Sequence, residues 1–210
     1  MIKSVKKKSL GQRKKSKSLI IFIKNPLTGK VKTRLAKDSS EGYALKVYHA
    51  LLDHTRSVAD SVDATRYLYY SDHIQEVDHW DNKKYDKNVQ VAGDLGLRMS
   101  DAIQKALKNH DKVIIIGSDC IQLRHVDIVT AFNKLDQFDV VIGPALDGGY
   151  YLLGLKYEIP EIFQDIQWST GEVASKTIEK ILSSGHSCHL LRELSDIDFL
   201  DDWKKYGYDL

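Results

Sequence analysis

The sequence predicts an α/β protein in which helices cover a central, largely parallel sheet of about seven strands. Short β-branched runs such as residues 112–117, "KVIIIG", alternate along the chain with segments whose apolar residues recur at helical spacing, such as residues 97–110. This alternation is typical of a parallel sheet between layers of helices. Residues 139–155 read strand, short turn, strand. Because so short a connection cannot cross over to a parallel neighbour, these two strands are expected to be either antiparallel or not adjacent, and the sheet is expected to be mixed.

The elements follow from the same two patterns, taken in chain order. The apolar or alternating runs predict strands at residues 18–23, 65–71, 88–92, 112–117, 139–143, 148–155 and 186–191. Helical spacing of apolar residues predicts helices at residues 39–62, 72–80, 97–110, 125–135, 169–185 and 195–207. Ligands of such sheets bind at the carboxyl ends of the strands. The segments that directly follow the strands are therefore the candidate sites.

Composition indicates one globular unit with an unusual first segment. The 210 residues are 42% hydrophobic and 29% charged, and no apolar run approaches the roughly 20 residues that a membrane span needs. Two cysteines, Cys120 and Cys188, provide no disulfide framework, which fits a reducing cytoplasm. We therefore expect a single domain over residues 19–210, without a membrane span.

Residues 1–18 differ from the rest in charge. They hold eight Lys or Arg and no acid, so that residues 19–210 carry 23 basic and 29 acidic side chains. The predicted domain is thus acidic, although the whole chain has a net charge of +2. We interpret residues 1–18 as a basic, disordered extension, with loose contact to RNA or an anionic surface as the alternative.

The first candidate segment, "KNPLTGKVKTRL" (24–35), follows the first strand and is rich in positive charge. It lacks the G-x-x-x-x-G-K-S/T pattern of a P-loop. Gly29 permits a tight loop, while Lys24, Lys32 and Arg34 can converge on one centre of negative charge. The segment therefore indicates either a phosphate-binding loop or a solvated basic turn.

The second segment, "AGDLGLRM" (92–99), follows the third strand. Gly93 and Gly96 would let backbone N–H groups face a ligand, and Arg98 adds a positive charge. Asp94 is equally suited to cap the helix that begins here. A ligand-binding turn and a simple strand-to-helix turn both remain open.

The third segment, "GSDC" (117–120), follows the most apolar strand. Burying Asp119 there is unfavourable unless a partner compensates its charge. A divalent cation that also holds phosphates is one such partner, since Mg²⁺ is typically bound by one or two carboxylates plus substrate phosphates. Helix capping by Ser118 or Asp119 is the alternative.

The fourth segment, "GPALDGGYY" (143–151), joins two strands. Asp147 is either a second carboxylate near the metal or part of an ordinary hairpin turn. Trp168 in "QWST" (167–170) could present its ring to a sugar or base, or be buried. Each of these signals is weak alone, but four of them fall at four strand ends.

Five stretches occurring in order also carry a family resemblance: "FIKNPLTGKVKTRLA", "VAGDLGLRMSDA", "VIIIGSDCIQL", "VVIGPALDGGYYLLGL" and "IQWSTGEV". Over residues 19–205 the chain resembles the bacterial GT-A-type nucleotide-diphospho-sugar transferases, usually labelled glycosyltransferases and related to the nucleotidyltransferases that make activated sugars and phospholactyl-guanosine. The resemblance implies a three-layer α/β/α sandwich. Ile121 replaces the proline that commonly follows Cys120 in the family, and a single acid stands where many GT-A enzymes have Asp-x-Asp.

The resemblance also implies roles for particular residues. The nucleotide would be bound by Lys24, Gly29, Lys32, Arg34, Gly93, Asp94, Gly96 and Arg98. The acceptor would lie against Gly148, Gly149, Tyr150, Trp168, Ser169 and Thr170. Catalysis would depend on Asp119, Asp147, Lys32 and Arg34, with Mg²⁺ or Mn²⁺ held by Asp119 and Asp147. Asp147 could instead act as a base.

Three functions are compatible with these patterns. The first is a metal-dependent glycosyltransferase that moves a sugar from a nucleotide-diphospho-sugar to a small-molecule acceptor. The second is a nucleotidyltransferase that joins an NTP to a phosphorylated acceptor and releases pyrophosphate. The third is a non-catalytic nucleotide- or RNA-binding module, against which the acidic charge of residues 19–210 argues.

Overall fold

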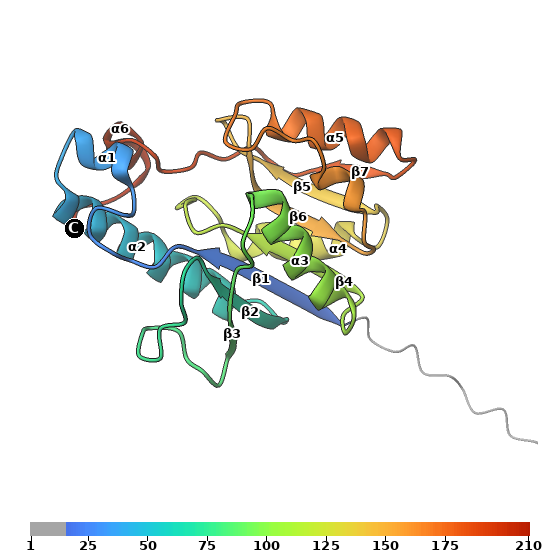
Figure 1. The fold of residues 1–210 in the computed structure, drawn as a ribbon, viewed down its shortest axis with the longest axis horizontal. Helices are drawn as coiled ribbons and strands as arrows, with labels where there is room; N and C mark the ends of the chain where they lie inside the picture. The colour runs from blue at the N-terminus through green and yellow to red at the C-terminus, as the bar shows by residue number, and fades with distance from the viewer. Residues whose placement is uncertain (1–15) are drawn as a thin grey trace, which may run out of the picture.

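The computed structural model describes residues 16–210 and contains a mixed sheet in the strand order β3-β2-β1-β4-β6-β5-β7 (Figure 1). The strands are β1 (Lys17–Ile23), β2 (Thr65–Tyr70), β3 (Tyr85–Val89), β4 (Lys112–Ile116), β5 (Val140–Pro144), β6 (Tyr150–Leu155) and β7 (Cys188–Leu190). Among them β6 alone runs antiparallel to its neighbours, β4 and β5. The expected mixed, mostly parallel sheet of seven strands is confirmed.

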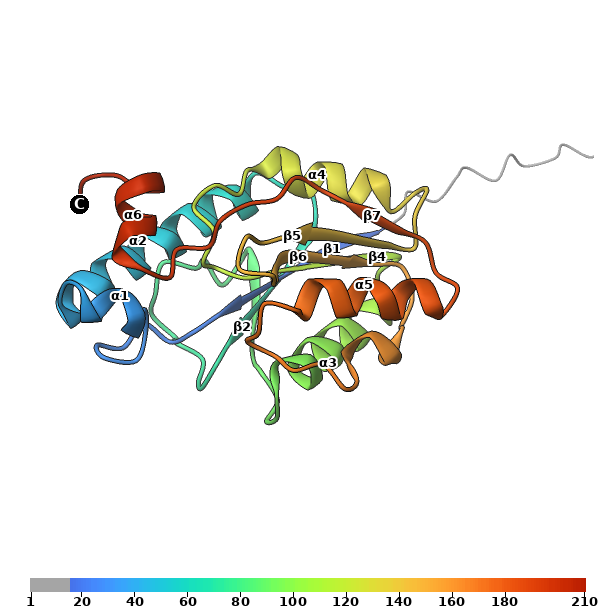
Figure 2. The ribbon, with the colours of Figure 1, turned by 90° about the horizontal axis from the view of Figure 1, so that it is seen from above.

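Helices cover both faces of this sheet, so that the described chain has three layers (Figure 2). One apolar cluster joins alternate residues of β1 and β4 to α2 (Glu41–Asp60) and α4 (His125–Lys134). The opposite cluster joins the intervening strand residues to α3 (Leu95–Leu107), the 3₁₀ helix η1 (Pro160–Phe163) and α5 (Val173–Ser183). Because successive strand side chains point to opposite faces, one apolar strand such as β4 supplies both clusters.

A third apolar cluster lies beyond the carboxyl ends of the strands. It joins the short helix α1 (Thr33–Lys37) and α2 to α6 (Leu200–Tyr206), with Leu35, Leu51 and Trp203 buried. The sequence did not predict α1. The cluster places the segment after β1 beside the C-terminal helix, and this contact shapes the candidate site.

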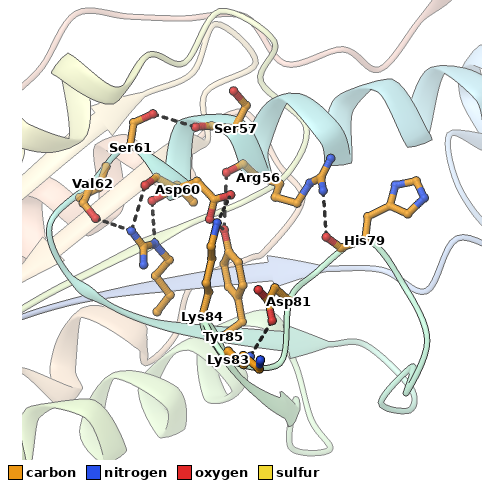
Figure 3. A network of polar contacts seen from close by, with 12 residues as sticks. Arg56, Ser57, Asp60, Ser61, Val62, His79, Asp81, Lys83, Lys84 and Tyr85 are labelled. Atoms are coloured by element: carbon orange, nitrogen blue, oxygen red, sulfur yellow. Dashed lines mark hydrogen bonds and ion pairs between the residues drawn. The ribbon is translucent and has the colours of Figure 1, made fainter.

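The predicted helix at residues 72–80 is wrong, because this segment is irregular. Side chains of α2 and β3 hold it in place (Figure 3). Arg56 of α2 donates to the His79 carbonyl oxygen at 2.9 Å, as Figure 3 shows. The nearly buried Lys87 ammonium pairs with Asp78 at 2.8 Å and donates to the Gln75 carbonyl oxygen at 3.1 Å. These tertiary contacts occupy backbone groups that a helix would have paired within itself.

The first described residues lie at the amino ends of the strands. The Ser16 amide donates to Asp111 beside the start of β4 over 2.8 Å. The expected basic extension over residues 1–18 lies mostly outside the described residues, but β1 already includes Lys17 and Ser18. In the described range, no helix is both long and apolar enough to cross a membrane.

Candidate active site

A cavity of about 690 Å³ opens at the carboxyl ends of β1, β4 and β5. Its walls come from the segments that follow β1 to β5, from residues 168–173 and from the chain beyond β7. The polar and charged residues that line it include Lys24, Lys30, Lys32, Arg34, Ser71, Gln90, Arg98, Ser118, Asp119, Asp147, Ser169, Thr170, Asp196 and Asp198. The four segments singled out in the sequence thus meet at one place, as expected for a sheet of this type.

Lys32 is the most enclosed charged residue of this cavity. Its side chain is 4% exposed, and its Nζ lies 2.7 Å from Asp119 Oδ1 and 3.7 Å from Asp198 Oδ1. Its backbone has φ 48° and ψ 41°, a left-handed conformation that costs a non-glycine residue about 1–2 kcal/mol. Such a conformation persists only where its surroundings enforce it. Here it turns the Lys32 ammonium toward the two carboxylates.

Asp198 is a site residue that the sequence patterns did not reveal. Its carboxylate accepts from Arg34 at 2.9 Å as well as facing Lys32. The Arg34 guanidinium also lies over the Phe199 ring, 5.8 Å from its centroid. Two cations of the loop after β1 thus converge on an acid that lies 164 residues from Arg34 in the sequence.

The segment with Asp196 and Asp198 reaches the site because it pairs with the ends of two strands. Leu194 donates its amide to the Pro144 carbonyl oxygen at 3.1 Å, extending the parallel pairing of β5 and β7. The Ser195 amide then donates to Gln122 Oε1 at 3.0 Å, and the Ile197 amide donates to the Asp119 carbonyl oxygen at 2.9 Å. The segment is thereby fastened to the turn after β4.

Arg192 anchors the same segment. Its guanidinium makes two hydrogen bonds to the buried Asp127 carboxylate, at 2.9 and 2.8 Å, and a third to the Gln122 carbonyl oxygen at 2.9 Å. Burial alone would raise the pKa of Asp127, but hydrogen bonds from Arg192 and Arg124 outweigh it and lower that pKa. Asp127 therefore stays ionised and holds Arg192 in place.

The carboxylates influence one another. Burial and the negative charge of Asp119, followed by that of Asp147, raise the pKa of Asp196 to about 7, although the Lys32 ammonium acts in the opposite direction. Burial and the charge of Asp119 also raise the pKa of Tyr48, whose hydroxyl accepts from the Lys24 amide at 2.8 Å. The carboxylates of Asp119, Asp196 and Asp198 thus lie near Lys32 on one side of the cavity.

Of the residues expected on the nucleotide side, the cavity brings together Lys24, Lys32, Arg34 and Arg98. The Arg98 guanidinium is held by the Gly93 carbonyl oxygen at 3.0 Å and by Gln90 Oε1 at 3.4 Å. The expected residues that do not line the cavity are Gly29, Gly93, Asp94 and Gly96. Asp94 caps α3 by accepting from the Leu97 amide at 2.8 Å, so the capping interpretation is confirmed for it.

On the acceptor side, Asp147, Gly149, Tyr150, Trp168, Ser169 and Thr170 line the cavity, whereas Gly148 does not. Asp147 Oδ1 accepts from the Gly149 amide at 2.9 Å and so forms the turn between β5 and β6. The Trp168 ring covers Gly96, where a Cβ atom would come within 2.4 Å of it. Among the described residues the Trp168 Nε1 has no hydrogen-bond partner.

A second cavity, of about 620 Å³, lies along β3, away from these carboxylates. Its cations are largely neutralised within the fold: Lys84 pairs with Asp60 at 3.3 Å, and Lys87 pairs with Asp78. Arg66 donates to main-chain carbonyl oxygens at the end of α2. This cavity therefore offers little free positive charge to a ligand.

The sheet order, the three layers and the cavity at the strand ends define the fold of nucleotide-diphospho-sugar transferases. A solved structure described as a "putative nucleotide-diphospho-sugar transferase" from Desulfovibrio desulfuricans G20 matches with a TM-score of 0.81 and 29% identity, over 87% of this chain and 82% of that one. The 4-diphosphocytidyl-2C-methyl-D-erythritol synthase from Anaerococcus prevotii has the same fold, with a TM-score of 0.62, 10% identity, and 92% and 95% of the two chains covered.

The chain belongs to the DUF2064 family, described as "uncharacterized protein conserved in bacteria", whose model matches residues 54–170. The resemblance to nucleotide-diphospho-sugar transferases is confirmed by the match to the Desulfovibrio structure and by the shared fold. A structure of Rv0371c from Mycobacterium tuberculosis H37Rv in complex with manganese also shares the fold, with a TM-score of 0.54, 15% identity, and 91% and 97% of the two chains covered. No curated protein is similar enough to the chain to match it.

Proposed function

We propose that the protein is a metal-dependent transferase that moves a sugar from a nucleotide-diphospho-sugar to a small-molecule acceptor. The observation that carries this proposal is the meeting of Lys32, Arg34, Asp119 and Asp198 in one cavity at the carboxyl ends of the strands. Paired cations suit the diphosphate of the donor, and carboxylates suit a divalent cation that bridges its oxygens. The fold and the 29% identical structure from Desulfovibrio support the class of reaction.

The donor diphosphate is assigned to the loop after β1. Arg34 is 58% exposed in its side chain, and Lys24 and Lys30 are also exposed at the cavity wall, so all three can reach a ligand. Lys32 points inward from the same loop. Together they would neutralise the charge that develops on the departing nucleoside diphosphate. Arg98, held by Gly93 and Gln90, is assigned to the nucleoside end of the donor.

The residues present fit a Mg²⁺ or Mn²⁺ ion bound jointly by protein and donor. Asp119 and Asp198 both lie within ion-pair distance of one cation, Lys32, and their side chains are 41% and 36% exposed. Residues 16–210 contain no cluster of three or more His, Cys, Asp or Glu arranged as a complete metal site. Two carboxylates with phosphate oxygens completing the shell match the usual mode of Mg²⁺ binding. We therefore assign Asp198, rather than Asp147, as the partner of Asp119.

In the reaction, the bond between the sugar C1 and the diphosphate oxygen breaks, and a bond from an acceptor oxygen to C1 forms. The acceptor proton passes to a base, and the nucleoside diphosphate leaves with the bonding electrons. When bound, the metal ion would stabilise charge on the leaving diphosphate oxygens. Asp147 is assigned to the acceptor side, since it lines the cavity with Gly149 and Tyr150. No covalent intermediate with the protein is needed, because positioning and charge neutralisation suffice.

A nucleotidyltransferase is the second candidate, and one observation favours it. The turn after β4 supplies a single acid, Asp119, and a further acid comes from the separate segment around Asp198. The synthase from Anaerococcus shares the fold. In this version an oxygen of a phosphorylated acceptor attacks the α-phosphorus of an NTP, and pyrophosphate leaves. Lys32 and Arg34 would then neutralise the pyrophosphate.

Ligand-dependent thermal unfolding distinguishes the candidates. The unfolding temperature of the protein is measured in the presence of Mg²⁺ or Mn²⁺ and of each member of a panel of NTPs and nucleotide-diphospho-sugars. A ligand present at 100 times its Kd should raise the free energy of unfolding by about 2.7 kcal/mol. Stabilisation by one nucleotide-sugar above its NDP supports glycosyl transfer, whereas preference for an NTP supports nucleotidyl transfer. If no nucleotide shifts the unfolding temperature with either metal, the proposed function is wrong.

A further inference from the structure

Lys32 occupies the position that a metal ion would share. Its ammonium lies between the acids proposed to bind the metal, 2.7 Å from Asp119 and 3.7 Å from Asp198. With a side chain only 4% exposed, the ammonium has little access to water. Lys32 is therefore the cation that faces both carboxylates, while Arg34 also pairs with Asp198 at 2.9 Å.

Lys32 and a divalent cation cannot both keep this arrangement. A metal bound through Asp119 Oδ1 would compete for the oxygen that Lys32 Nζ now contacts at 2.7 Å. Two cations so close would repel strongly in an enclosed site. Lys32 must therefore move when the metal enters. Its side chain lines the cavity, where phosphate oxygens could accept it.

We propose that Lys32 holds the Asp119–Asp198 pair in the nucleotide-free protein and is exchanged for a divalent cation when nucleotide phosphates draw its ammonium away. The inference rests on the proposed function and adds how the binding of the metal depends on the binding of the nucleotide. Metal alone binds weakly because it must displace Lys32, and phosphates remove that obstacle. Metal and nucleotide therefore bind cooperatively, each strengthening the other by the same factor.

The left-handed backbone at Lys32 supports this exchange. Lys32 precedes α1, and its carbonyl oxygen accepts the Ala36 amide at 2.9 Å, so the backbone is fixed although its conformation is unfavourable. The mobile part is then the side chain alone. A fixed backbone with a four-carbon side chain lets the ammonium pass from the carboxylates to a phosphate without rearranging the loop.

The first experiment measures Mn²⁺ binding without nucleotide by electron paramagnetic resonance. Lys32→Met removes the ammonium at similar side-chain length, and it should bind Mn²⁺ about tenfold or more tightly than the wild type. Lys32→Arg keeps the charge and should bind as weakly as the wild type. The matched control is Lys37→Met, because Lys37 is an exposed lysine in the last turn of α1 and does not line the cavity. Its effect should stay within about threefold, since exposed charges are screened.

The outcomes separate the inference from the proposed function. If folded Lys32→Met binds Mn²⁺ no more tightly than the wild type, while Asp119→Asn abolishes binding, the exchange is refuted and the metal site stands. If neither the wild type nor any variant binds Mn²⁺, even with inorganic pyrophosphate present, both are refuted. The double variant Lys32→Met with Asp119→Asn should lose the higher Mn²⁺ affinity of Lys32→Met. This loss would show that the ion binds at Asp119.

A second measurement needs no Lys32 variant. The wild-type protein is acetylated briefly with an N-hydroxysuccinimide ester, and the modified lysines are quantified by peptide mass spectrometry. Saturating Mn²⁺ should raise acetylation of Lys32 several-fold, because its ammonium leaves the carboxylates, and should leave acetylation of the exposed Lys37 unchanged. An unchanged rate at Lys32 under Mn²⁺ saturation would overturn the exchange even if Lys32→Met fails to fold.

Discussion

The Ile197 amide donates a hydrogen bond to the Asp119 carbonyl oxygen over 2.9 Å, joining the turn after β4 to a segment 78 residues further along the chain. Through this contact the Asp119 and Asp198 carboxylates face the same cavity, with Lys32 between them. The carboxylate pair therefore exists only while the segment around residue 197 remains fastened to the turn.

The Arg192–Asp127 pair should be needed for that fastening. Asp127→Asn removes the charge to which the Arg192 guanidinium makes two short hydrogen bonds. We expect a loss of about 1–3 kcal/mol in the free energy of unfolding, measured in urea, together with weaker Mn²⁺ binding. Lys204→Met is the control. It removes an exposed pair with Asp201 and should change stability by less than about 1 kcal/mol. Equal effects of the two variants would show that the Arg192–Asp127 pair has no special role.

Asp119→Asn should abolish metal-dependent function while the fold survives. The substitution keeps the size of the side chain but removes one of the two carboxylates beside Lys32. Turnover should fall by about 10²-fold or more, and Mn²⁺ should no longer add to the stabilisation by pyrophosphate in thermal unfolding. Asp201→Asn, on the exposed face of α6, serves as the control. Near-normal metal-dependent turnover in Asp119→Asn would refute the assignment.

Protonation of Asp196 should make the free energy of unfolding decrease as the pH rises from 4 to 7. Its pKa is raised to about 7 by burial and by the charges of Asp119 and Asp147, against an ordinary value near 4. In this window the folded state binds more protons than the unfolded state, so raising the pH removes stability. Asp196→Asn lacks this titration and should exceed the wild type by about 1–3 kcal/mol at pH 8, with no gain at pH 4. Urea unfolding at the two pH values tests this, and a gain of equal size at both would contradict it.

Gly148→Ala should destabilise the turn between β5 and β6. Gly148 has a φ of 85°, and an added Cβ would come within 2.0 Å of the Gly171 carbonyl oxygen. The expected loss in unfolding free energy is about 2–4 kcal/mol. Gly42→Ala is the matched control, because a Cβ at Gly42 in α2 meets nothing within 4 Å and alanine favours a helix by about 1 kcal/mol. Opposite signs in thermal unfolding are therefore expected for the two substitutions.

Removing residues 1–15 should leave stability and turnover unchanged. Ser16 contacts Asp111 at the amino ends of the strands, whereas the cavity lies at their carboxyl ends. A longer truncation, of residues 1–17, should lower the unfolding temperature, because it removes the Ser16 hydrogen bonds and the Lys17 ammonium over the Phe132 ring. A large loss of turnover in the shorter truncation would assign the basic segment a direct role.

The sequence alone predicted the sheet, because strands buried on both faces require apolar runs that few other structures need. β4 is such a run, and all five of its residues are buried. Helical spacing likewise identified α2, α3 and α4 to within a few residues. The short connection after residue 143 excluded a parallel pairing of β5 with β6, and the structure shows that the two strands pair antiparallel. Local chemistry also placed Asp94 at the start of α3 and Asp119 after β4.

Only the tertiary structure determined which carboxylates lie beside Asp119 and Lys32 in the cavity. Asp196 and Asp198 lie in a stretch, "SDIDFLDDW", that reads as the start of a helix, and nothing nearby in the sequence relates it to the loop after β1. They reach the cavity because the chain after β7 pairs with the end of β5 and hydrogen-bonds to Gln122 and Asp119. The inward turn of Lys32 has the same origin, since its left-handed backbone contradicts its own local preference and is imposed by the surrounding contacts. Burial and periodicity are local properties that a sequence encodes directly, whereas the meeting of charges across 164 residues depends on the completed sheet.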